Sequence, residues 1–172
     1  MGANQARHPV LEALSVVARL AGPGDIAALE RLYRGLEIEM RELHSMWPLA
    51  DGLEEPVDAS FLRLLDDPDA IVALGEIDGY PFGFVVAGVD SILPQAGGEK
   101  IGSLRLVYVD PEAREVALGE TMRDYVMDLL RQRGISKFDA YVLPGHRLAK
   151  NFFEAGGFSA RSIIMHHDDS RI

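Results

Sequence analysis

The sequence predicts an α/β domain of the α+β type, in which a mixed, mostly antiparallel central sheet is flanked by helices. Runs rich in β-branched and aromatic residues alternate with segments whose apolar residues recur at helical spacing. The middle of the chain holds three such β runs separated by turns, and a helix and a further β run follow them. A meander followed by a strand–helix–strand order makes a mixed sheet with helices on its faces.

Each expected element rests on a run of suitable residues and on a start or stop signal. In chain order they are a strand at 15–20, a helix from Asp25 to about Ser45, a short helix from Asp58 to 65, strands at 70–77, 82–89 and 101–109, a helix at 118–134, a strand at 137–143, a short helix at 146–155 and a last strand at 158–166. Asp25 and Asp58 are good N-caps, and Trp47-Pro48 is expected to end the first long helix. Asp78-Gly79 is the turn of a hairpin.

Length and composition fit one domain. The chain has 172 residues, of which 48% are hydrophobic and 26% charged, as is typical of a globular protein. We expect residues 1–12 to form a flexible leader and residues 13–172 a single domain. Cysteine is absent, which excludes disulfides and thiolate chemistry.

The charge and hydropathy of the chain bear on its partners. The formal net charge is −10, without a Lys/Arg-rich run, so we expect no nucleic-acid partner, whereas a cationic amine would be attracted. No apolar stretch is long enough for a bilayer, and residues 10–21 lack the pattern of a signal peptide. We therefore expect a cytoplasmic protein that has no membrane partner.

The segment 107–119 could bind an anion. A strand is expected to end at Val109, and a helix is expected to begin near Leu118. The N-terminus of a helix offers free N–H groups, and the small residues Ala117 and Gly119 would let a phosphate approach them. Taken by itself, the segment favours a plain strand-to-helix turn over an anion site.

Two motifs carry a resemblance to a known family. Val109-Asp110-Pro111 is followed by Arg114-Glu115-Val116-Ala117-Leu118-Gly119, and the chain later reads Phe152-Phe153-Glu154-Ala155-Gly156-Gly157-Phe158. These resemble the Val-x-Pro and Arg/Gln-x-x-Gly-x-Gly/Ala loop and the Phe-Tyr-Glu-x-x-Gly-Phe motif of the GNAT N-acetyltransferase superfamily. The opening 18–25 and the hairpin 79–84 are similar too, so the resemblance covers roughly residues 15–166.

The resemblance implies an N-acetyltransferase that uses acetyl-CoA as acyl donor and acetylates a primary amine of a small molecule or peptide by direct attack. The CoA-binding residues implied are the backbone of Val107 and Val109, Arg114 beside the loop, the N–H groups of Glu115, Val116, Ala117, Leu118, Gly119 and Glu120 for the pyrophosphate, and His146 and Phe153 in the last helix. The N–H of Val109 or of a neighbour would stabilise the oxyanion. Family members often form dimers, so a homodimer is a further alternative.

The sequence departs from the family pattern at several positions. Ala117 replaces the first loop glycine, Glu115-Val116 replaces the usual Gly-Lys, and His146 lies where an Asn often contacts CoA. Phe153 replaces the tyrosine that protonates the departing thiolate. A thiol has a reference pKa of about 8.5, so its release as thiolate at pH 7 costs only about 2 kcal/mol. Tyr141 and Tyr108 are alternative acids.

The acceptor amine needs a base, a water chain or desolvation, because exposing its lone pair at pH 7 costs roughly 4.6 kcal/mol for a pKa near 10.4. Candidate bases lie in and before the loop that follows the first helix: His44, Asp51, Glu54 and Glu55. The departures leave open a catalytically inactive acyl-CoA-binding or interaction module with the same fold. His166-His167-Asp168-Asp169 predicts a polar tail and no metal site, because adjacent strand residues point to opposite faces.

Overall fold

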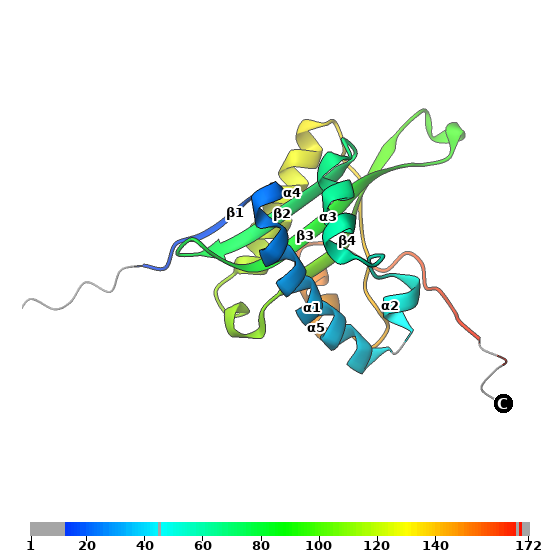
Figure 1. Ribbon diagram of the computed structural model, residues 1–172. Helices are drawn as coiled ribbons and strands as arrows, with labels where there is room; N and C mark the ends of the chain where they lie inside the picture. Colours follow the sequence, from blue (N-terminus) through cyan, green and yellow to red (C-terminus); the bar gives the residue numbers. More distant parts are fainter. Residues whose placement is uncertain (1–12, 45, 168, 170–172) are drawn as a thin grey trace, which may run out of the picture.

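A mixed five-stranded sheet forms the middle layer of the computed structural model, which describes residues 13–44, 46–167 and 169 (Figure 1). The strands are β1 (Val16–Leu20), β2 (Ala70–Ile77), β3 (Tyr80–Ser91), β4 (Lys100–Val109) and β5 (Phe138–Ala140). They lie in the order β1-β2-β3-β4-β5; β1 to β4 pair antiparallel, and β4 and β5 pair parallel. The fold class predicted from the sequence is confirmed.

Helices cover both faces of this sheet (Figure 1). The helices are η1 (Pro23–Asp25), α1 (Ile26–Leu43), α2 (Trp47–Ala50), α3 (Val57–Asp66), η2 (Pro94–Ala96), η3 (Pro111–Ala113), α4 (Leu118–Gln132) and α5 (Arg147–Ala155). α1, α2 and α3 share one core with Phe84 and Val86 of β3, and α4 and α5 share the other with Val85 and Ala87. Successive residues of β3 thus enter opposite cores, as the pleat of a strand requires.

The start of α1 differs in one detail from the expected cap. Asp25 occupies the N-cap position, but its side chain makes no capping bond to the helix. Its carboxylate instead accepts from the N–H of Gly22 and from both terminal nitrogens of Arg19 on β1. The ion pair with Arg19 lowers the pKa of Asp25. The residue therefore joins the first strand to the turn before α1.

The segment after α1 is more helical than expected. α1 ends at Leu43, and α2 begins at Trp47, where a loop was predicted. Pro48 lies in the first turn of α2, where a missing N–H costs nothing. α3 begins at Val57, so Asp58 lies in its first turn rather than at its cap.

The predicted last strand, 158–166, is wrong. Residues 158–167 form neither strand nor helix, and β5 is shorter than the expected 137–143. β propensity does not by itself make a strand when no ladder partner lies alongside. Arg161 forms an ion pair with Asp139 of β5, whereas Ile164 and Met165 are among the most exposed apolar side chains of the described part. The leader expected at 1–12 lies outside the described residues.

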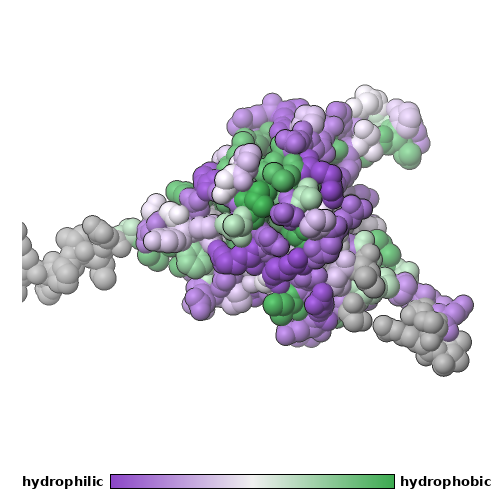
Figure 2. Space-filling view, viewed as in Figure 1, coloured by the Kyte–Doolittle hydropathy of each residue, from purple (hydrophilic) through white to green (hydrophobic). Residues whose placement is uncertain are grey.

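Figure 2 shows the face that α1 and α3 cover. This face is mainly hydrophilic, with hydrophobic residues near its middle and at the tip of the projecting connection between β3 and β4. Within the described part of the chain, no helix is both long and apolar enough to cross a membrane.

A bulge in β4 determines which of its backbone groups face β5. Val86 pairs with Leu106 and Ala87 with Leu104, so Arg105 is an extra residue on β4. Before the bulge, β4 is bonded to the β5 segment: Gly102 N–H donates to Lys137, and Tyr141 N–H donates to the carbonyl of Leu104. Beyond Leu104 this pairing stops while β4 continues to Val109. β4 and β5 therefore separate at the end of β4 that leads to α4.

Candidate functional site

The backbone of Val107 and Val109 faces the edge of β4 that β5 has left. Asp110 N–H donates to Phe82 on β3, and Tyr108 is opposite Phe84. In an antiparallel ladder the bonding direction alternates along the strand, so the intervening Val107 and Val109 turn their N–H and C=O groups away from β3. These are the two residues that the resemblance implies for the acyl-donor arm.

A run of backbone N–H groups follows this strand. Among the described residues, the N–H groups of Glu115, Val116 and Ala117 have no hydrogen-bond acceptor, and Thr121 N–H donates to the carbonyl of Ala117 at the start of α4. The α-helix supplies no partner to its first N–H groups, and its dipole places positive charge there. The loop therefore presents consecutive donors suited to an anion.

Ala117 adopts a left-handed conformation to begin α4. Its φ is 58° and its ψ is 22°, which costs an L-residue about 1–2 kcal/mol. This strain arises because alanine occupies the position where the family's loop motif has its first glycine.

We expect Ala117→Gly to stabilise the protein by about 0.5–1 kcal/mol, because the relief of strain exceeds the entropy that glycine adds to the unfolded chain. Urea unfolding checks this. Asp78→Gly is the matched control: Asp78 also has a positive φ, but its carboxylate accepts from Ser15 N–H, so that variant should gain nothing. Equal or lower stability of Ala117→Gly would show that the loop is not strained.

Three side chains from distant segments meet beside the end of β4. Arg114 Nε donates to the carbonyl of Val109 at 2.9 Å, and Arg114 Nη2 donates to Glu39 Oε2 at 2.5 Å. Glu39 Oε1 lies 3.1 Å from Nε2 of His146, the N-cap residue of α5. The hydrogen bond to His146 and the Arg114 guanidinium hold the pKa of Glu39 below its usual value. Arg114 and His146 were expected from the sequence, whereas Glu39 was not.

Gly35 explains why Glu39 reaches the site. A Cβ on Gly35 would lie 2.5 Å from the hydroxyl of Tyr108, so glycine is what allows α1 to approach β4. Glu39 lies one turn further on the same face of α1. A glycine inside an otherwise strong helical pattern indicates a close approach of this kind, and it was the available signal.

The candidate acids and the family tyrosine position lie in different surroundings. Tyr108 packs in the core between Phe84 and α1, and burial raises the pKa of its phenol. Tyr141 follows β5 and is 59% exposed. Phe153 is buried against Phe158 and the α4 side of the sheet. Of these, only Tyr141 offers a phenol accessible from solvent.

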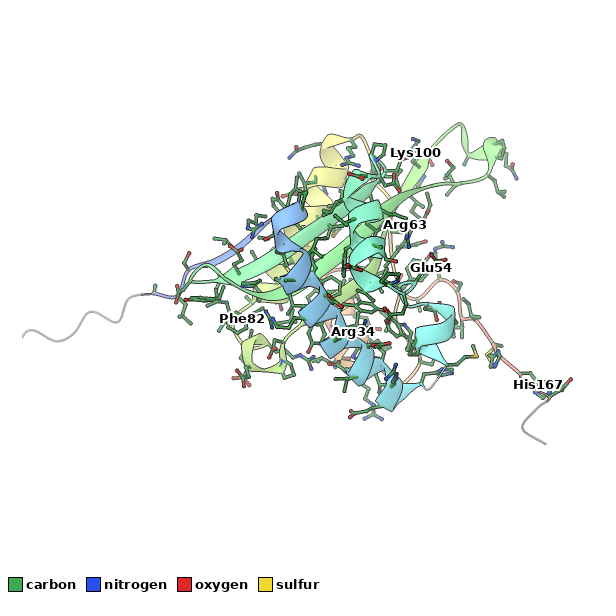
Figure 3. All side chains as sticks on the ribbon, in the orientation of Figure 1. Arg34, Glu54, Arg63, Phe82, Lys100 and His167 are labelled. Atoms are coloured by element: carbon green, nitrogen blue, oxygen red, sulfur yellow. The ribbon has the colours of Figure 1, made fainter. Side chains whose placement is uncertain are left out.

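The candidate bases lie on the α1–α3 side. Glu54 has an 86% exposed side chain that pairs with Arg63 at 3.1 Å, and the two residues are neighbours in Figure 3. Glu55 pairs with Arg34 and accepts from Val57 N–H. His44 and Asp51 are exposed. Within the described residues, no hydrogen bond or ion pair joins any of these four side chains to Val107, Val109 or the loop.

No metal centre is built by the described residues, among which no group of three His, Asp or Glu side chains could hold an ion. In the C-terminal tail, His167 Nε2 lies 2.7 Å from Asp169.

Comparisons with known proteins bear on this arrangement. The model of the acetyltransferase (GNAT) family matches residues 32–158. An aminoglycoside N-acetyltransferase, AAC(6')-Iy, in complex with CoA superposes with a TM-score of 0.72 at 15% identity, over 93% of this chain and 99% of that one. A ribosomal-protein-alanine N-acetyltransferase from Brucella melitensis biovar Abortus 2308 gives 0.67 at 18% identity, over 89% and 99%. A transcriptional regulator from Bacillus halodurans C-125 gives 0.71 at 16% identity, over 89% and 100%.

At these identities the likeness to solved structures shows the fold. No curated protein matches the chain.

Proposed function

This chain belongs to the GNAT acetyltransferase family, and we propose that it transfers the acetyl group of acetyl-CoA to a primary amine by direct attack. The observation that carries the proposal is the run of N–H groups from Glu115 to Glu120, which continues the backbone edge of Val107 and Val109 that β5 leaves unpaired. A pyrophosphate on the loop and a pantetheine arm along the strand fit these donors and acceptors.

In the proposed reaction the amine nitrogen attacks the thioester carbonyl, and the Val109 N–H donates to the oxygen that gains charge. The carbon–sulfur bond then breaks, the thiolate leaves, and the amine nitrogen loses a proton. Tyr141 is the proposed donor to the thiolate, because its phenol is the accessible one. Glu54 remains the proposed base. Its exposure means that it would act through water.

Charge near the loop sets the expected strength of CoA binding. Glu115 and Glu120 are exposed there, Arg114 is neutralised by Glu39, and Arg123 is paired with Asp124. The loop therefore carries little uncompensated positive charge. We expect acetyl-CoA and free CoA to bind in the micromolar range rather than more tightly.

Calorimetric titration of acetyl-CoA into the wild type and into Glu115→Lys tests the proposal. Reversing an exposed charge beside the pyrophosphate should tighten binding by about 2- to 5-fold at low salt, and less at high salt. Asp66→Lys, an equal charge reversal in the last turn of α3, is the control that should bind as the wild type does. No heat at millimolar acetyl-CoA with any variant would overturn the CoA site.

One observation favours a second candidate, an acyl-CoA-binding module without transfer. Phe153, at the family's tyrosine position, is buried and carries no hydroxyl. Thiol release and acetylated product, measured over a panel of amines, separate the two. CoA binding without product from any amine would support the second candidate.

A homodimer belongs to the same proposal. Ile163, Ile164 and Met165 form a consecutive apolar run that is 72–88% exposed in the single chain, and association would cover it. Analytical ultracentrifugation decides this: a monomer at tens of micromolar protein would contradict it.

A further inference from the structure

The contact between Glu39, Arg114 and His146 joins three elements that the acyl donor would touch or pass between. Glu39 lies on α1, Arg114 precedes the N–H run, and His146 begins α5. The three side chains are 15–26% exposed, so water screens their interactions only in part. One carboxylate uses a separate oxygen for each partner, which fixes the loop and α5 relative to α1.

The polar edge of Arg114 is already engaged. Nε is taken by the Val109 carbonyl and Nη2 by Glu39, and the guanidinium lies 5.9 Å from the ring centre of Tyr108. With Nε and Nη2 held, Arg114 fixes the end of β4 against the start of the loop rather than wrapping around a phosphate. The guanidinium is planar, so fixing two of its nitrogens fixes its orientation.

His146 is held in the same way. Its Nε2 faces Glu39, which leaves Nδ1 as the ring nitrogen available to another group. His146 also donates its backbone N–H to Leu143, so both its ring and its main chain are fixed where α5 begins. The carboxylate thus orients a second residue that the sequence assigned to CoA.

We propose that Glu39 is a positioning residue for acyl-donor binding: it holds Arg114 and His146 so that the β4 end and its N–H loop keep the spacing from α5 that CoA requires. This inference rests on the proposed function, because it concerns the same site. Glu39 acts through these two residues and need not touch CoA itself.

The test compares Glu39→Gln with Glu42→Gln. Both remove one carboxylate from α1, but the exposed Glu42 has no hydrogen bond or ion pair with any described residue. We expect Glu39→Gln to raise the Kd and KM for acetyl-CoA about 5- to 10-fold, as loss of charge-assisted bonds implies, with kcat and the acceptor KM within about 2-fold. Glu42→Gln should match the wild type.

Two further measurements separate positioning from general weakening of the fold. In an Arg114→Gln background, Glu39→Gln should have a much smaller effect on Kd, because the two residues act as one unit. The stability gap between wild type and Glu39→Gln should be full at pH values above 4.5, the unperturbed pKa, and should shrink as pH falls toward the lower folded-state pKa of Glu39. The groups that face the Glu39 carboxylate are the Arg114 guanidinium and the His146 ring.

The outcomes are distinguishable. If the wild type does not bind acetyl-CoA, the proposed function fails. If the wild type binds and Glu39→Gln binds equally well, or if kcat falls in place of affinity, the positioning role alone is overturned.

Discussion

Replacing Gly35 by alanine is expected to destabilise the protein by about 1–2 kcal/mol, although alanine favours a helix interior by about 1 kcal/mol. The new Cβ would lie 2.5 Å from the hydroxyl oxygen of Tyr108 and 2.8 Å from Cζ. Tyr108 is buried against Phe84, so its ring has little room to move, and overpacking costs about 1–3 kcal/mol. Thermal unfolding should show a drop of about 2–8 °C in Tm.

The background of Tyr108→Leu provides the control. Without the phenol ring, Gly35→Ala should be neutral or stabilising, because only its helix propensity remains. If Gly35→Ala raises Tm in the wild type, α1 does not need its close approach to β4, and the reason for Glu39 reaching Arg114 is lost. Weaker acetyl-CoA binding by folded Gly35→Ala would link the approach of α1 to the site.

The sheet was predictable because each of its first four strands carries its own signal. The strands before and after Asp78-Gly79 are runs rich in β-forming residues, and they are joined by a turn that requires positive φ. Asp78 and Gly79 both have a positive φ. The absence of a strand at 158–166 was not predictable in this way. Residues such as Ile163 and Ile164 favour a strand, but pairing depends on a neighbour, and none lies beside them within the described chain.

The loop of the site was predictable because a short local pattern specifies a strand end, small residues and a helix start. The Glu39 contact was not, because it joins positions 75 and 107 residues apart, and one more carboxylate on α1 carries no distinguishing mark. The bulge at Arg105 is also a property of pairing between strands. Only Gly35 pointed toward the contact.

Replacing Glu120 by proline is expected to weaken acetyl-CoA binding about 10- to 100-fold relative to Glu120→Ala, the loss expected for one hydrogen bond to a charged group. Both variants remove the carboxylate, but only proline removes the backbone N–H. Glu120 is the third residue of α4, where no helical bond uses that N–H, and Thr121 still donates to Ala117. Proline is tolerated in the first turn, so the helix should persist.

Calorimetry of the two variants, with circular dichroism to compare their helix content, measures the contribution of one N–H of the loop. An unfolding free energy within about 1 kcal/mol of Glu120→Ala would show that proline has not broken α4. Equal affinities in two folded variants would mean that this N–H does not face a phosphate. In that case the phosphate would be bound by the N–H groups from Glu115 to Gly119. Because Ala117→Gly changes the backbone between these donors, its CoA affinity would then decide where the phosphate binds.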